Sequence, residues 1–218
     1  MNKNFKYFFY VFIISVIGIF VMAYGFKDQP WSKTLMIIFI AIAAIIFIAY
    51  LVSMLFCYLD SKKLDRMLVI DDYQAVIKHC QKERKIIELF LPERITYYEY
   101  LLLLSYFALD DSEKIDSYLI KFENKMDLYP MILYWKSCYE FSKENYDNIK
   151  DYKDKFVNSF DVIRQQERYQ NLINVLEILI LYIDKKVEEA KELLTKIDMN
   201  QISMPSTLKA LKIIENSK

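Results

Sequence analysis

Two long stretches without a charged residue occupy the N-terminal quarter of the chain. The first covers 20 residues (7–26) and the second covers 25 (35–59). A helix rises ~1.5 Å per residue, so ~20 apolar residues match the ~30 Å hydrocarbon core of a bilayer. The eight residues between the stretches are mostly polar and suit a tight turn. The pattern therefore predicts a two-span transmembrane hairpin over residues 1–59.

Two other interpretations of this segment are a pair of buried helices in a soluble protein and a cleaved signal peptide. Buried helices of this length seldom lack every charge. Lys3 and Lys6 give a basic start, and Val21-Met22-Ala23 is similar to a small-residue cleavage site. However, the first apolar region is longer than the ~7–15 residues of a signal peptide. If it were cleaved, the second stretch would still anchor the chain.

The flanking basic residues predict both termini and residues 60–218 in the cytoplasm. Two lysines precede the first stretch, two lie in the hairpin loop, and three basic residues follow the second stretch: Lys3 and Lys6; Lys27 and Lys33; Lys62, Lys63 and Arg66. This excess is modest but favours the inside orientation. The Lys- and Ile-rich usage with few Arg is typical of AT-rich bacterial genomes. We therefore expect an integral protein of a bacterial cell membrane.

Small residues recur along the second stretch, at Ala41, Ala44, Ala49 and Ser53. Small side chains let transmembrane helices approach closely. They predict either packing within the hairpin or a contact between two copies, which would make a homo-oligomer through the spans.

From residue 60 onward, amphipathic helical patterns replace the uncharged stretches. Residues 57–70 suit a helix that continues out of the second span. The run 173–183 is apolar but short, and Asn174 and Glu177 interrupt it, so we expect a buried helix there and not a third span. Further helices are expected over 93–109, 112–124, 130–143, 146–156, 164–183, 186–197 and 206–214, with Ser112 as an N-cap and Pro130 in a first turn.

Four turn segments with similar sequences divide longer apolar helices from shorter ones. They cover residues 71–76, 110–115, 144–149 and 185–190, and their starts are 39, 34 and 41 residues apart. A hairpin of two such helices has more apolar surface than it can bury alone, so neighbouring hairpins must stack. The spacing predicts an all-α repeat domain of α-hairpins over residues 60–218. An irregular helical bundle is the alternative.

The third turn resembles the helix–turn–helix junction of the tetratricopeptide family. Tyr139 to Ile149 reads Tyr-Glu-Phe-Ser-Lys-Glu-Asn-Tyr-Asp-Asn-Ile, with an Asn-Tyr pair before an acidic residue. Val187 to Ala190 is similar to the start of the family's second helix, and Pro130 falls where a new repeat would begin. The junction glycine of the family is replaced by Asp71, Asp110, Glu144 or Lys185, and its small packing residue by Val76, Ile115 or Ile149.

The resemblance implies a solenoid whose leading helices line a concave groove for a partner peptide. Within that frame Tyr97, Tyr100 and Tyr134 fall on groove-lining positions. Aromatic side chains suit such a role because they offer large contact area with few rotatable bonds. The alternative is that the three rings pack between hairpins.

The composition excludes several kinds of chemistry. Gly18 and Gly25 are the two glycines, so the glycine-rich phosphate-binding loops are absent. Cys57, Cys80 and Cys138 are widely spaced and form neither a disulfide framework nor a zinc site. The formal net charge is zero, which gives no basic field for nucleic acid. We expect no cofactor and no metal.

The one histidine, His79, lies beside Cys80 on an expected helix, with Glu83 four residues on. Adjacent helical residues point ~100° apart, so His79 and Cys80 do not make a catalytic pair. We expect a partly exposed helix histidine and a protein that is not an enzyme. A membrane enzyme would have to use polar residues at the span boundary: Asp60, Lys62, Lys63, Asp65 and Arg66.

Two functions fit this organisation. The first is a membrane-anchored interaction or scaffold module that presents the repeat domain to a protein or peptide in the cytoplasm. The alternative is an immunity or self-protection protein against a membrane-active toxin, for which the sequence offers no positive mark.

Overall fold

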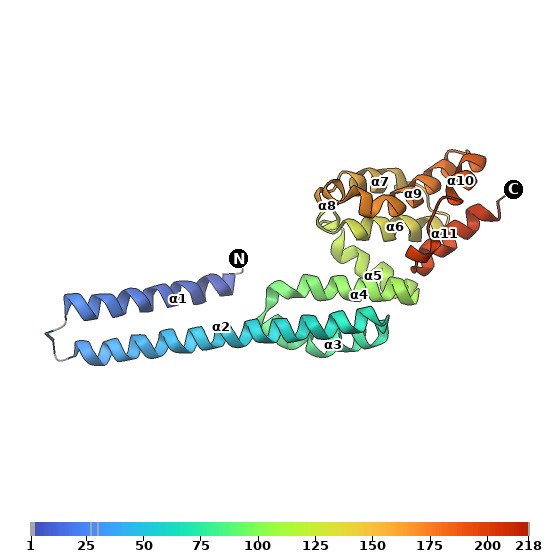
Figure 1. The fold of residues 1–218 in the computed structure, drawn as a ribbon. Coiled ribbons are helices and arrows are strands. Elements are labelled where there is room, and N and C mark those ends of the chain that lie inside the picture. Colours follow the sequence, from blue (N-terminus) through green and yellow to red (C-terminus); the bar gives the residue numbers. More distant parts are fainter. Residues whose placement is uncertain (1–2, 27, 30, 218) are drawn as a thin grey trace. The chain divides into compact units, whose positions relative to one another are not determined.

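The structure is a computed structural model that describes residues 3–26, 28–29 and 31–217, and every regular element in these ranges is helical (Figure 1). The all-α class expected from the sequence is therefore confirmed for the described part of the chain. The chain divides into two compact units, Met1–Tyr98 and Glu99–Lys218. The elements are α1 (Lys3–Phe20), η1 (Val21–Gly25), α2 (Ser32–Val69), α3 (Tyr73–Phe90), η2 (Pro92–Arg94), α4 (Ile95–Leu109), α5 (Ser112–Phe122), η3 (Met126–Leu128), α6 (Pro130–Ser142), α7 (Ile149–Val157), α8 (Phe160–Arg164), α9 (Gln166–Ile183), α10 (Val187–Leu194), η4 (Met199–Gln201) and α11 (Pro205–Glu215).

In the first unit, α1 and α2 are antiparallel neighbours (Figure 1). Gly18 faces the Phe39 ring so closely that an added Cβ would lie 2.9 Å from it. The hydroxyl of Ser32 donates to the Met22 carbonyl at 2.8 Å and ties the start of α2 to η1. Ala41, Ala44 and Ala49 are exposed. These three alanines therefore do not pack within the hairpin, where Gly18 makes the close approach. Ser53 is half-buried, and a contact between two copies stays a prediction.

Helix α2 runs without interruption over 38 residues, which corresponds to ~57 Å. It contains the second uncharged stretch and continues through the segment expected to lead the first hairpin. Among the described residues it is the one helix long and apolar enough to cross a bilayer; the apolar part of α1, Tyr10–Gly25, is shorter. No residue of the most apolar part of α2 is buried inside the protein. The first span therefore stays a prediction.

The helices beyond the uncharged stretches begin and end within a few residues of their expected positions. Pro130 occupies the first turn of α6, as expected. The N-cap of α5 is Asp111 and not Ser112, because the Asp111 carboxylate accepts the Lys114 N–H at 3.2 Å. The helix expected over 164–183 corresponds to α9, and the short helix α8 before it was not expected from the sequence. The C-terminal half of α9 is buried in the second unit, as expected for the run 173–183.

The four expected junctions share one backbone conformation. Asp71, Asp110, Glu144 and Lys185 all have a positive φ, between 55° and 62°, and no other non-glycine residue in the described chain does. At each junction this residue donates its N–H to the carbonyl three residues earlier, and the next residue donates to the carbonyl five before it. These paired bonds form a Schellman motif, which usually places glycine at the left-handed position. The junctions thus end four helices in the same way without glycine.

The fifth residue after each junction is fully buried. These residues are Val76, Ile115, Ile149 and Ala190, each with no exposed surface. The chain therefore repeats two features at matched positions, a left-handed helix end and a buried side chain in the first turns of the following helix. Both features lie at the spacing that the sequence indicated.

Replacing Lys185 with glycine is expected to stabilise the second unit by roughly 0.5–1 kcal/mol, because a left-handed conformation costs a side-chain-bearing residue roughly 1 kcal/mol. Lys212→Gly is the matched control: Lys212 is exposed within α11, where glycine costs roughly 1 kcal/mol. Chemical denaturation of the detergent-solubilised protein measures both changes. A loss of stability in Lys185→Gly would contradict the assigned conformation.

Helix α6 forms the centre of the second unit. Eight of its 13 residues are buried, and it contacts α7, α9, α11 and η3. The C-terminal helix α11 packs against α6 and also contacts α9 and α10. Its buried face consists of Ser206, Thr207, Ala210, Leu211 and Ile214. Helix α11 therefore covers a face of α6 that lies more than sixty residues earlier in the chain.

Candidate functional site

A buried carboxylate stands directly after the uncharged stretch of α2. Asp60 is 5% exposed, and three donors from later elements surround its oxygens. His79 on α3 donates to Oδ1 at 2.7 Å, and the Tyr98 hydroxyl on α4 donates to Oδ2 at 2.7 Å. The Arg94 Nη1 of η2 lies 3.4 Å from Oδ2 as an ion pair. One side chain of α2 therefore holds three elements that follow it.

Arg94 adds further bonds to the same part of α2. Its Nη1 donates to the Cys57 carbonyl at 3.1 Å, and its Nη2 donates to the Ser61 hydroxyl at 2.8 Å. The guanidinium also lies 5.5 Å from the centre of the Tyr97 ring and 6.0 Å from that of Tyr98. These contacts hold the chain from η2 into α4 against α2. We call Asp60, His79, Arg94 and Tyr98 the Asp60 cluster.

Burial keeps the Tyr98 hydroxyl of the cluster and two cysteine thiols protonated. The pKa of Tyr98 is raised far above its usual range by burial and by the hydrogen bond to the Asp60 carboxylate, so its hydroxyl stays a donor. Burial, with a smaller contribution from Asp60, raises the pKa of the neighbouring Cys80 thiol to about 12. Burial likewise raises the pKa of Cys138 in α6 to about 12. Neither thiol is an activated nucleophile.

The Asp60 cluster fixes neighbouring elements to one another, because the charges and hydrogen-bonding groups of its members already pair within the cluster. A buried ionised carboxylate is tolerated only with a counter-charge and several hydrogen bonds, and Asp60 has both. A substrate or ligand would have to displace one of these partners to reach it. The arrangement can therefore fix the end of the apolar helix to the segment that follows.

The structure corrects the expectation for His79, which is 8% exposed and not a partly exposed helix residue. The pairing joins positions 60 and 79 to the neighbouring positions 94 and 98, and no local pattern links these three parts of the sequence. One signal was present in the sequence: an acidic residue that directly follows 25 uncharged residues needs partners if the helix continues into a packed domain. The other expected boundary residues, Lys62, Lys63, Asp65 and Arg66, are exposed.

The three tyrosines expected to line a groove have different surroundings. Tyr97 is half-buried beside Arg94 in the first unit. Tyr100 is half-buried in the second unit, where its ring lies 5.3 Å from Tyr129 and 5.6 Å from Trp135. Tyr134 is only 2% exposed. Partner binding by Tyr97 and Tyr100 stays a prediction.

Tyr134 is covered by the protein's own C-terminal helix. Its ring packs 6.1 Å from Phe156, and the Thr207 hydroxyl of α11 donates to the Tyr134 hydroxyl at 3.4 Å. The expectation that Tyr134 offers its ring to a partner is not met in this conformation, because α11 packs on that face of α6.

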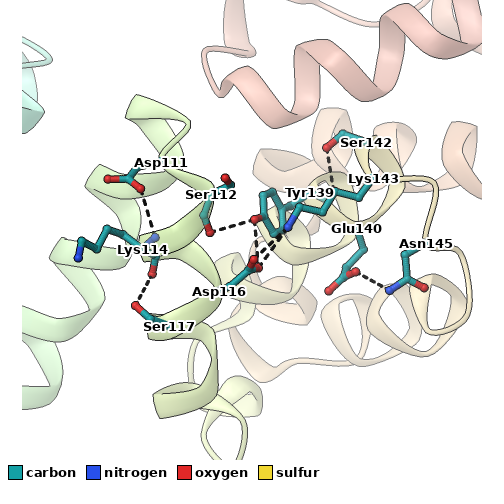
Figure 2. Close-up of polar contacts among 10 residues, drawn as sticks. All are labelled: Asp111, Ser112, Lys114, Asp116, Ser117, Tyr139, Glu140, Ser142, Lys143 and Asn145. Atoms are coloured by element: carbon teal, nitrogen blue, oxygen red, sulfur yellow. Dashed lines mark hydrogen bonds and ion pairs between the residues drawn. The ribbon is translucent and has the colours of Figure 1, made fainter.

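A second polar cluster joins α5 to the end of α6 (Figure 2). The Tyr139 hydroxyl donates to Asp116 at 3.0 Å and lies 3.2 Å from the Ser112 carbonyl. The Lys143 ammonium donates to Asp116 at 3.0 Å and lies 4.1 Å from the centre of the Tyr139 ring. Burial is the main cause that raises the Tyr139 pKa, so the phenol stays a donor. These contacts link one expected hairpin to the next.

Among the described residues, no group of three or more His, Cys, Asp or Glu is placed to hold a metal ion. Comparison with protein-family models, curated proteins and solved structures finds no match for this chain.

Proposed function

We propose that the protein is a membrane-anchored interaction module, in which a two-span hairpin holds an array of α-hairpins in the cytoplasm. The observation that carries the proposal is the apolar surface of α2. Large apolar side chains are exposed along the whole uncharged part of this helix, and Ile45, for example, is 66% exposed. A helix in a soluble core would bury such residues, whereas in a bilayer lipid covers them.

Support for a first span comes from α1. Its exposed side chains are also large and apolar, among them Ile14, Ile17 and Phe20. Contact with α2 at Gly18 makes the two helices a packed pair, as expected for spans joined by a short turn. The basic flanks of the two stretches then favour cytoplasmic termini.

Support for a repeat array comes from the four matching junctions. The same left-handed helix end and the same buried position recur at Asp71, Asp110, Glu144 and Lys185. Similar α-hairpins stacked side by side present extended surfaces to other proteins. The likeness to tetratricopeptide repeats in the sequence makes a protein or peptide the favoured partner class.

Two measurements on the full-length protein test the proposal. First, the protein should stay in the membrane pellet after alkaline carbonate extraction, and a C-terminal reporter should be active on the cytoplasmic side. Second, chemical crosslinking in native membranes should capture a specific protein, and a Tyr97→Ala/Tyr100→Ala double variant should lose it.

Tyr152→Ala is the control for the crosslinking, because Tyr152 is a half-buried tyrosine of the trailing helix α7. Release by carbonate would contradict the anchor. Capture that is equal in all variants would exclude Tyr97 and Tyr100 as the binding surface, and absence of any captured protein would contradict the interaction role.

A further inference from the structure

Helix α3 lies against the end of α2 in a fixed register. The turn at Asp71 and Asp72 reverses the chain, and the 2.7 Å bond between His79 and Asp60 sets which turns face each other. Figure 1 shows α3 beside the later half of α2. The C-terminal end of α3 therefore points back toward the uncharged part of α2. In the membrane-anchored arrangement proposed above, on which this inference rests, α3 returns toward the bilayer.

One exposed face of α3 has an unusual composition. Beside Gln74, it holds five exposed lysine and aliphatic residues, since 3.6 residues per turn place them on one side of the helix: Lys78, Lys82, Lys85, Ile86 and Leu89. The opposite face holds buried residues such as Val76, Cys80 and Ile87. We call the five exposed residues the α3 stripe.

The order of residues along the stripe matches the order of the headgroup and acyl layers at a membrane interface. The lysines come first, and the apolar residues come last, at the end that points toward the apolar part of α2. Leu89 is 69% exposed and Ile86 is 46% exposed, although each could have been polar at no cost to packing. Segments that enter an interface keep lysines at headgroup level and place large apolar side chains toward the acyl chains.

The length of the second span gives the depth of the stripe relative to the hydrocarbon core of the bilayer. If the hydrocarbon begins at Leu35, its ~30 Å ends near residue 54 or 55, which is ~8 Å before Asp60. Leu89 follows His79 by ten residues, so it lies ~15 Å further along α3 in the direction of the bilayer. It would then reach ~7 Å past the hydrocarbon boundary, within the ~5–10 Å typical of interfacial helices.

We propose that the α3 stripe is a second membrane contact, with Ile86 and Leu89 in the acyl boundary and the three lysines on anionic lipid headgroups. The residues from 60 onward carry 25 basic and 28 acidic groups, so their overall charge does not attract an anionic surface. The three lysines of the stripe oppose this balance locally. Lys82 pairs with Glu83 at 3.8 Å, yet the Lys82 side chain stays 79% exposed. A lysine near an anionic surface favours binding roughly fivefold.

Spin labelling of the full-length protein in vesicles tests this contact. A nitroxide is attached at Leu89→Cys in a Cys57→Ser background, since the buried Cys80 and Cys138 thiols resist labelling. Collision with oxygen reports lipid, and collision with a water-soluble nickel chelate reports solvent. Ile45→Cys is the reference for hydrocarbon, and Ile120→Cys, an exposed α5 position, is the reference for water.

In phosphatidylglycerol vesicles, we expect nickel accessibility at Leu89 to lie several-fold below that at Ile120 and oxygen accessibility to rise toward that at Ile45. Changing Lys78, Lys82 and Lys85 to glutamine should shift Leu89 toward the water reference, as should phosphatidylcholine vesicles. A Leu89 label as accessible to nickel as Ile120, with Ile45 in lipid, would overturn this contact and leave the anchor intact.

Two other results would also overturn the contact. Shielding of Leu89 from both oxygen and nickel would mean that protein, and not lipid, covers the stripe. A water-like Ile45 label would overturn the membrane anchor itself, and the contact with it.

Discussion

Replacing Asp60 with alanine is expected to destabilise the first unit by about 3–5 kcal/mol, because it leaves the Arg94 charge, whose side chain is only 14% exposed, without its counter-charge. His79 and Tyr98 would each lose the acceptor that now lies 2.7 Å away. Arg94 would keep its bonds to Cys57 and Ser61, but these are neutral acceptors. The segment from α3 to the start of α4 should then detach from α2.

Hydrogen exchange of the α3 amides measures this effect, since it reports local opening without requiring reversible unfolding of the whole membrane protein. A loss of 3 kcal/mol accelerates exchange by a factor of roughly 100 or more. Asp65→Ala is the matched control, because Asp65 lies one turn further along α2 and is exposed. Similar exchange in the two variants would show that the Asp60 cluster does not hold α3.

Truncating Ile149 to alanine is expected to destabilise the second unit by about 2–5 kcal/mol. Ile149 is fully buried five residues after the Glu144 junction, at the start of α7, which packs on α6 and α9. Removing most of its side chain leaves a cavity in an interior that relaxes only partly. The cost should fall on the packing of α6, α7 and α9 together.

Chemical denaturation in detergent checks this change, with Ile163→Ala as the control. Ile163 is the same residue type in the short helix α8, but it is 62% exposed, so its truncation should change stability by less than about 0.5 kcal/mol. Equal effects of the two substitutions would mean that the position after the junction is not a packing site. The same test at Ile115 would show whether the fifth position after a second junction, Asp110, is also a packing site.

The local features of this protein follow from short stretches of its sequence. Proline in the first turn of α6, acidic residues before α3 and α5, and uncharged stretches of membrane length are all signals within a few residues of their effect. The junction positions were also visible, because spacing and similar neighbours marked them. Their left-handed conformation was not, since glutamate and lysine have no preference for it and aspartate adopts it only occasionally.

The contacts between distant residues were hidden in the sequence. Asp60 and Tyr98 are 38 residues apart, and Tyr134 and Thr207 are 73 apart. No periodic pattern links such positions, because the partner depends on how whole helices pack. For this reason His79 was expected to be partly exposed and Tyr134 to line a groove, whereas the folded chain buries both.

The sequence by itself determined that this chain is helical, that its N-terminal stretches have membrane length and where four helices end. These properties depend on the hydrophobic periodicity, the charge distribution and the capping groups of neighbouring residues. The tertiary structure alone decided that Asp60 gathers three donors, that α11 covers Tyr134 and that α3 turns a lysine-and-leucine face outward. Those outcomes depend on which helix faces meet, and burial of apolar surface fixes that only when the whole unit folds.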